Sequence, residues 1–188
     1  MDLELRRHIE EIVTISDHEF HLISQYFATK KFSKKEFLIL QGEKVNYMYF
    51  VVSGLLKLTF NDESGKEHIL SFAMEDWWET DYLAFNTGSR ASMSLQCLES
   101  SHILCLTLDN FKNLCATFPK IEHFFLQKAI SGHIATQQRI LSLLGSNAND
   151  RYNQLLSKYP SLIHRIPKTT LAAYLGVSRE TLSRLHIR

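Results

Sequence analysis

The apolar pattern of this chain changes its period near the middle, and that change limits the folds open to it. From Lys30 to Leu108, short runs such as residues 56–60 alternate apolar and polar side chains, and turn residues such as 61–65 separate them. Alternation with a period of two predicts strands. From Asp109 onward, apolar residues recur every three or four positions, which predicts helices. We therefore expect an α+β fold that begins with an antiparallel, jelly-roll-like β-roll.

Two helices are predicted on either side of the roll. Residues 16–27 have Ser16 as a helix cap and Glu19 three positions later, which is a capping box. Residues 120–144 carry an apolar stripe at helical spacing over about 36 Å. Gly132 and Ala135 within that stripe permit a second helix to approach closely. We expect a homodimer seam on this helix, and the alternative is a helix that only packs against the roll.

A small-residue segment at residues 145–149, Gly-Ser-Asn-Ala-Asn, predicts a hinge after the long helix. The expected organisation is therefore a sensor domain at residues 1–118, a dimerisation helix at 119–145 and a helical C-terminal domain at 146–188. No internal repeat is visible in the sequence.

The stretch from Lys168 to Leu185 has turn-forming and capping residues where a helix-turn-helix requires them. Gly176 permits the left-handed backbone of a tight turn, and Ser178 can cap the second helix. The apolar residues expected to pack the two helices together are Leu171, Ala172, Leu175, Val177, Leu182 and Leu185. We therefore predict a DNA-binding unit whose second helix enters the major groove.

Polar residues of this unit are expected to contact DNA. Arginine suits the paired acceptors of guanine, glutamate accepts from cytosine, and hydroxyl groups bind phosphates. The predicted DNA-binding residues are Arg179, Glu180, Ser183, Arg184, Thr170, Thr181 and Ser178. Residues 149–188 contain seven Lys or Arg against two Asp or Glu, whereas residues 1–148 contain 14 against 18. The C-terminal fifth is therefore the part suited to a polyanion.

Several segments resemble the Crp/Fnr family of bacterial regulators. Residues 178–184, Ser-Arg-Glu-Thr-Leu-Ser-Arg, look like its recognition-helix motif, and residues 120–144 fall where that family has its dimerising helix. The segments similar to its cyclic-nucleotide-binding-type roll are residues 40–43, 52–54 and 65–70. The resemblance implies a homodimer that binds a DNA palindrome through Arg179, Glu180 and Arg184, with RNA polymerase as a further partner.

The cyclic-nucleotide site of that family is altered in this chain. Cyclic-AMP-binding members have Gly-Glu, whose glutamate binds the ribose, and then Arg-Ser, which binds the phosphate. The matching residues here are Glu79-Thr80 and Arg90-Ala91, so only Arg90 agrees. The iron–sulfur members use an N-terminal cysteine cluster, whereas no cysteine precedes Cys97. We therefore expect no cofactor and no cyclic-AMP binding, and an effector whose identity is open.

The family often has a β-wing after its recognition helix, and no residues for a full wing follow here before Arg188. The alternative function is therefore a ligand-binding sensor that acts through protein contacts and has a degenerate DNA-binding unit.

A group of aromatic residues lies where the effector pocket of that family would be. The residues predicted for this pocket are Trp77, Trp78, Thr80, Tyr82 and Arg90. Such a group could surround a small apolar or aromatic effector. The alternative is that these aromatic side chains fill the roll in place of a ligand.

Catalytic and membrane functions lack supporting motifs. The nine histidines include no His-x-His pair, which argues against a metal-dependent enzyme built on a similar roll. There is no nucleophile elbow or phosphate-binding loop. No apolar run approaches the ~18 residues of a membrane helix, and the N-terminus lacks a signal-peptide pattern. We expect a cytoplasmic protein without catalytic residues, a metal site or a membrane partner.

Overall fold

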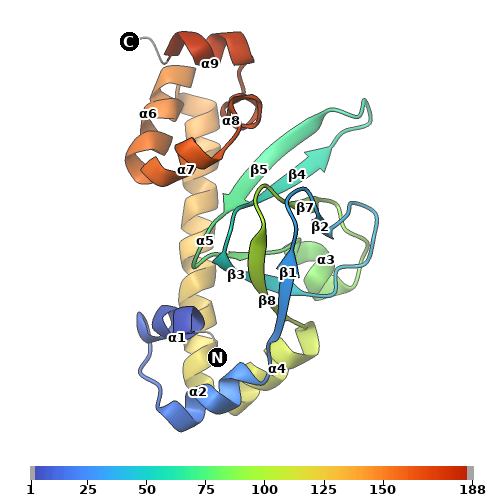
Figure 1. Ribbon diagram of the computed structural model, residues 1–188, viewed down its shortest axis with the longest axis vertical. Helices are drawn as coiled ribbons and strands as arrows, with labels where there is room; N and C mark the ends of the chain where they lie inside the picture. The colour runs from blue at the N-terminus through green and yellow to red at the C-terminus, as the bar shows by residue number, and fades with distance from the viewer. Residues whose placement is uncertain (1–2, 186–188) are drawn as a thin grey trace.

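Two β-sheets and one long helix organise the chain in the computed structural model (Figure 1). The structure describes residues 3–185, without the side chain of residue 185. The strands are β1 (Ala28–Phe32), β2 (Phe37–Ile39), β3 (Met48–Ser53), β4 (Leu56–Asn61), β5 (Glu67–Ala73), β6 (Trp78–Glu79), β7 (Ser94–Cys97) and β8 (Ser101–Leu106). The helices are α1 (Leu3–Glu10), α2 (Asp17–Ser24), α3 (Tyr82–Thr87), α4 (Leu108–Thr117), α5 (Pro119–Gly145), α6 (Ala148–Lys158), α7 (Pro160–Arg165), α8 (Lys168–Leu175) and α9 (Arg179–Leu185). The predicted α+β architecture is confirmed.

The strands form a jelly-roll-like sandwich of two four-stranded sheets, with the orders β1-β8-β3-β6 and β2-β7-β4-β5. All of these pairings are antiparallel. The strand predicted at residues 56–60 and the turn predicted after it are confirmed as β4 and the turn of the β4–β5 hairpin. Asp62 closes its turn, because its carboxylate accepts hydrogen bonds from the backbone N–H groups of Ser64 and Lys66 at 3.0 and 3.1 Å.

Strand β4 departs from its prediction, because both of its faces are covered. The alternation at residues 56–60 indicates one buried face, yet the side chains on the other face, Lys57 and Thr59, are only 8% and 1% exposed. Lys57 lies opposite Phe72 of β5, which belongs to an apolar cluster shared with the C-terminal helices. Its ammonium group binds the Glu67 carboxylate at 2.6 Å, so the buried charge is paired.

Helices α1 and α2 pack against the sheet that contains β1 and β8. The capping box of α2 is confirmed: the Ser16 hydroxyl accepts from the Glu19 N–H at 3.2 Å, and the Glu19 carboxylate accepts from the Ser16 N–H at 2.8 Å. The helix ends at Ser24, earlier than predicted, because the N–H groups of Tyr26 and Phe27 bond three residues back in tighter turns. Helix α1 has no counterpart among the predicted elements. Its buried residues are Leu5, His8 and Ile9.

The predicted long helix is confirmed as α5, and it has two apolar rows. One row packs on the roll through Ile121 and Phe124, which are 1% and 0% exposed. The other row is exposed and consists of Leu126, Ile130, Ile134, Leu141 and Leu144. Gly132 and Ala135 lie on a different side of the helix from this row, since a turn of about 100° per residue places Ala135 roughly 140° from Ile130. The exposed row was not predicted from the sequence, and a dimer seam at Gly132 and Ala135 stays a prediction.

A second apolar cluster joins the C-terminal helices to the roll. Its members from the roll are Leu55, Ile69 and Phe72, and those from the helices include Leu155, Leu162, Leu171 and Leu175. The ring of Phe72 lies 4.9 Å from that of Tyr174 on α8. Because this cluster crosses the expected domain limits, the divisions at residues 118 and 145 stay predictions.

Candidate nucleic-acid interface and sensor site

Helices α8 and α9 and the turn between them have the geometry predicted from their sequence. Gly176 ends α8 in a left-handed conformation with φ of 69°, which favours glycine. The Val177 N–H donates to the Ala172 carbonyl at 3.0 Å, so the turn closes on the last turn of α8. Ser178 then starts α9, because its hydroxyl accepts from the Thr181 N–H at 3.2 Å.

Apolar side chains hold the two helices together as the sequence predicts. Those of Leu171, Ala172, Leu175 and Leu182 are all at most 3% exposed. Val177 is half-buried and packs against the same cluster. The inward position expected for the side chain of Leu185 lies outside the described residues. The short side chain of Ala172 permits the close approach that a helix-turn-helix needs.

Four of the polar residues predicted to contact DNA lie on the exposed surface of α9. Arg179, Glu180, Ser183 and Arg184 are all exposed. In Figure 1, α9 lies at the end of the molecule opposite α1 and α2, so the roll does not cover it. A helix that is buried on one side and polar on the other has the form of a recognition helix.

Three hydroxyl residues predicted to contact DNA have different surroundings. Thr181 is exposed and Thr170 is half-buried on α8. The hydroxyl of Ser178 is exposed and lies 3.2 Å from that of Thr181. Ser178 therefore serves first as the helix cap, and its contact with DNA stays a prediction.

Glu180 is held in its charged form. Its pKa lies below the ordinary value because its carboxylate accepts from its own backbone N–H, and then from Ser178. A carboxylate that stays ionised keeps the acceptor that a cytosine amino group needs.

Two arginines stabilise the C-terminal end of α8, a role that their sequence did not indicate. Arg139 of α5 donates to the Tyr174 carbonyl and lies 3.7 Å above the Tyr174 ring. Arg151 of α6 donates to the Leu175 carbonyl at 2.9 Å. These carbonyls end a helix and lack partners within it, so both arginines fix α8 against the neighbouring helices.

A third arginine joins the DNA-binding unit to the roll. The guanidinium of Arg165 on α7 binds the Glu75 carboxylate through two nitrogens, at 2.7 and 2.9 Å. The same group binds the Glu99 carboxylate at 2.7 and 3.1 Å. These two hydrogen-bonded carboxylates raise the Arg165 pKa. The sequence offered no signal for this contact, because the partners are 66 and 90 positions away.

The two tryptophans predicted for the effector pocket have different neighbours. The Trp77 ring lies 5.1 Å from Tyr159 of the C-terminal unit. The Trp78 ring lies 5.0 Å from both Phe50 and Phe125, between the sheet and α5. The structure thus packs each tryptophan into a separate interface, and a shared pocket for the two stays a prediction.

The remaining predicted pocket residues are also spread over different surroundings. Thr80 is fully buried, and its hydroxyl donates to the Tyr47 carbonyl at 2.9 Å. Arg90 is exposed and donates to the Gly42 carbonyl at 2.8 Å. Tyr82, on α3, is 50% exposed.

A buried carboxylate takes up the backbone donors beside these residues. Asp81 is 0% exposed and accepts from the Ala84 N–H at 3.1 Å at the start of α3. It also accepts from the N–H and hydroxyl of Ser92, at 2.7 and 2.9 Å, and from the Met93 N–H at 3.2 Å. Burial acts to raise the pKa of Asp81, but these hydrogen bonds outweigh it and lower that pKa. An internal anion therefore occupies donors of the kind that bind a phosphate.

The pKa of Glu79 is shifted in the opposite direction from that of Asp81. Burial raises its pKa to about 7, against smaller opposing effects of hydrogen bonds from Ser71 and the Thr80 backbone. The Ser71 hydroxyl donates to the Glu79 carboxylate at 2.7 Å. A carboxyl group of this kind changes its charge near neutral pH.

The acidic residues around Trp77 do not converge on one point. Glu75 binds Arg165, Asp76 binds Arg7 at 2.9 Å, and Asp81 binds the Ser92 backbone. Within the described part of the chain, no three His, Cys, Asp or Glu side chains are grouped so as to hold a metal ion. Residues 3–185 also include no helix with the length and apolar character of a membrane span.

A β-roll followed by a long helix and a helix-turn-helix defines the class of DNA-binding regulators that have a cyclic-nucleotide-binding-type sensor domain. Residues 29–118 match the cyclic nucleotide-binding domain family. The chain is 28% identical over 187 residues to the regulatory protein HlyX of Actinobacillus pleuropneumoniae, covering 92% of this chain and 76% of that protein. It is 25% identical over 165 residues to the cAMP-activated global transcriptional regulator CRP of Salmonella typhimurium, covering 82% and 79%.

These similarities, to a cyclic nucleotide-binding domain and to regulators of the Crp/Fnr type, support the same family for this chain. Its fold is also that of FixK2 from Bradyrhizobium japonicum, with a TM-score of 0.75 at 14% identity and coverage of 86% of this chain and 83% of that one. The resemblance found in the recognition-helix and roll segments is therefore confirmed.

Proposed function

We propose that the protein acts in the cytoplasm as a homodimer that binds a palindromic DNA site through α9 of each protomer. The observation that carries this proposal is the exposed group Arg179, Glu180, Ser183 and Arg184, on a helix anchored by buried Leu182. Two such helices would enter successive major grooves, about 34 Å apart. RNA polymerase is a further proposed partner, and we assign no catalytic activity to the protein.

The exposed apolar row of α5 supports the dimer. Leu126, Ile130 and Ile134 are 54%, 45% and 51% exposed, one turn apart along the helix. A second copy of α5 packed on this row would remove those side chains from water. The homodimer would then place both α9 helices on one side of the assembly.

The sensor site would not take cyclic AMP. Thr80 stands where the ribose-binding glutamate would be, and its hydroxyl is already bound to Tyr47. Ala91 lacks the hydroxyl of the phosphate-binding serine, and the Asp81 carboxylate would repel a phosphate nearby. We expect millimolar cyclic AMP to leave the unfolding temperature unchanged, since only ligands bound to the native state raise it. A rise of several degrees would contradict this assignment.

DNA binding itself is tested by fluorescence anisotropy with labelled random duplex DNA at several salt concentrations. Affinity should fall steeply as salt rises, because bound arginines release counterions from the phosphates. The double variant Arg179→Ala, Arg184→Ala should lose most of this binding, while Lys112→Ala, which removes an exposed charge on α4, should not. Equal binding by all three proteins would favour a sensor that acts through protein contacts and has a degenerate DNA-binding unit.

A further inference from the structure

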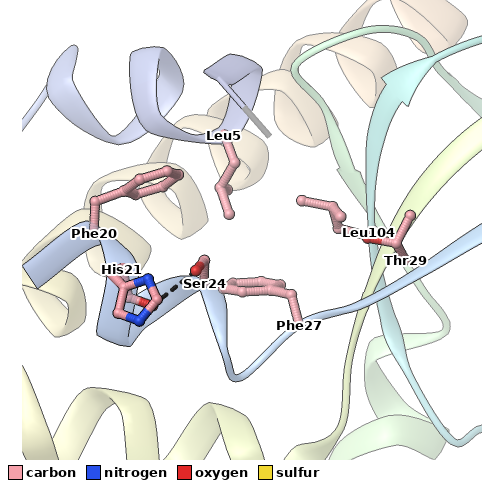
Figure 2. A pocket seen from close by; sticks show the side chains of 7 residues that line it. All are labelled: Leu5, Phe20, His21, Ser24, Phe27, Thr29 and Leu104. Atoms are coloured by element: carbon pink, nitrogen blue, oxygen red, sulfur yellow. Dashed lines mark hydrogen bonds between the residues drawn. The ribbon is translucent and has the colours of Figure 1, made fainter. Parts of the chain in front are cut away.

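A cavity of about 270 Å³ lies between the N-terminal helices and the outer face of the β1–β8 pair (Figure 2). Leu5 of α1, Phe20 of α2 and Leu104 of β8 line it and are at most 2% exposed. Figure 2 shows their side chains, with that of Phe27, directed toward a common central space. Ser24 of α2 also lines the cavity. The structure therefore holds a partly open space that is lined by buried apolar side chains and by the polar residues His21, Ser24 and Thr29.

This cavity is separate from the region predicted to bind the effector. Neither Thr80 nor Arg90 is among its lining residues. Leu104 lies opposite Phe50 in the β3–β8 register, and Phe50 faces His8 of α1 at 5.1 Å. The cavity is therefore on the face of the sheet that the N-terminal helices cover, outside the interior of the roll.

The size and lining of the cavity define the molecule that it can hold. An apolar cavity of about 150 Å³ accommodates benzene, so this one has room for a single ring with a substituent. The lining includes His21 but no Lys, Arg, Asp or Glu, so it offers no permanent charge to an ion. The Ser24 hydroxyl donates to the His21 carbonyl at 2.8 Å, and its oxygen can still accept a hydrogen bond from a ligand.

We propose that this cavity binds a small uncharged molecule with one aromatic ring and one hydroxyl group, and that it is an effector site of the regulator. The binding part stands on the cavity alone, and the regulatory part rests on the proposed function.

Ion pairs connect the helices around the cavity to the rest of the molecule. Glu19 of α2 binds Lys120 of α5 at 2.8 Å, and Glu11 binds Lys128 of α5 at 3.0 Å. Arg7 of α1 binds Asp76, the neighbour of the Glu75 that holds Arg165. A ligand that moves α1 or α2 would therefore shift both α5 and the loop that holds the DNA-binding unit.

Binding is measured by fluorescence with benzyl alcohol and toluene as probes. The chain has two tryptophans, so Trp77→Phe leaves Trp78 as the reporter, 6.2 Å from the cavity-lining Phe27. Both probes should change its emission in a saturable way and raise the unfolding temperature. Benzyl alcohol should bind about fivefold more tightly than toluene, because of its hydrogen bond to Ser24. Absence of saturable binding by either probe would overturn the proposal.

Two variants of α2 locate the site. Ser24→Phe places a ring in the cavity and should abolish binding of both probes, whereas His18→Phe, on the exposed side of α2, should not. Ser24→Ala keeps the cavity and should remove the preference for benzyl alcohol, which decides the matter if Ser24→Phe does not fold. Unchanged preference in Ser24→Ala would refute the assignment of the polar contact. DNA affinity is measured separately, so its absence would refute the proposed function without affecting the ligand result.

Discussion

The buried His8 and the half-buried Glu79 respond to pH in opposite directions. Burial, followed by the nearby Lys128 ammonium, lowers the pKa of His8 to about 4, although Glu11 acts to raise it. The His8 Nε2 atom has no hydrogen-bond partner among the described residues, so a charge there would be poorly solvated. Burial raises the pKa of Glu79 to about 7. Folding therefore makes His8 harder to protonate and Glu79 easier to protonate.

These shifts predict opposite slopes of stability against pH. Below pH 6.5, the unfolded chain binds more protons at His8 than the native chain, so the free energy of unfolding falls as pH decreases toward about 4. At Glu79 the native chain binds more, so the free energy of unfolding rises as pH decreases from about 7 toward the ordinary carboxyl range. In the native protein, the two effects largely cancel between pH 6.5 and 5.

Single substitutions should separate the two effects. Glu79→Gln should leave a loss of stability as pH falls, and His8→Gln a gain, each by up to about 1.4 kcal/mol per pH unit. Urea unfolding at pH 6.5 and pH 5 measures both slopes. Slopes that do not differ between the two variants would show that these groups are not shifted as described.

At the residue scale, the excess of basic residues in the C-terminal fifth was a weaker guide to DNA binding than the helix-turn-helix motif. Arg151 and Arg165 belong to the seven basic residues of the C-terminal fifth, yet they bind Leu175, Glu75 and Glu99 inside the protein. Net charge does not distinguish an arginine that is free to bind phosphate from one that closes a helix end. The spacing of Gly176 and Ser178 was the better guide to the helix-turn-helix, because each residue has a local backbone role.

At the scale of elements, α5 presents two possible dimer faces. The exposed row at Ile130 and Ile134 is apolar, whereas Gly132 and Ala135 offer a small-residue surface elsewhere on the helix. Periodicity predicted the two ends of this helix within one residue each. It did not predict that the helix has a second, exposed apolar row. The roll-facing row depends on which strands lie beside the helix, and that arrangement involves distant parts of the chain.

A charge on one face should break the dimer, and a charge on the other should not. Ile130→Asp would place a carboxylate in the proposed apolar seam and should shift the protein to monomers. Ala135→Asp is the matched control on an exposed residue of the same helix. Sedimentation equilibrium measures both, and dissociation by Ala135→Asp alone would move the seam to the small-residue face.

The Arg165 contact should fix the DNA-binding unit on the roll. Arg165→Gln removes the ion pairs with Glu75 and Glu99 while leaving the helix-turn-helix residues intact. We expect faster amide hydrogen exchange in α7 and β5, and a loss of about 1–3 kcal/mol of stability, since two part-buried carboxylates lose their partner. Lys158→Gln, at an exposed position on α6, is the control. Unchanged exchange in Arg165→Gln would mean that apolar packing alone holds the units together.

At the scale of the whole molecule, the order of elements was predictable and their contacts were not. Alternation and helical spacing located the roll, the long helix and the helix-turn-helix, because each depends on neighbouring residues. The cover over β4, the cavity under α1 and α2, and the bridge from Glu75 to Arg165 depend on residues far apart in sequence. The helix-turn-helix that carries the candidate DNA surface was predictable for the same local reason, whereas a shared pocket for the predicted effector residues stays a prediction.

The most direct test is selection of binding sites from random duplex DNA at stated salt, with the native protein, Arg179→Ala and Lys112→Ala. We expect the native protein and Lys112→Ala to enrich one palindrome whose half-sites are one helical turn apart. Arg179→Ala should bind that site more weakly, by an amount equivalent to about 1–3 kcal/mol, with relaxed preference at one base of each half-site. Enrichment of no sequence by the native protein, or of the same palindrome with equal affinity by Arg179→Ala, would contradict sequence-specific binding through α9.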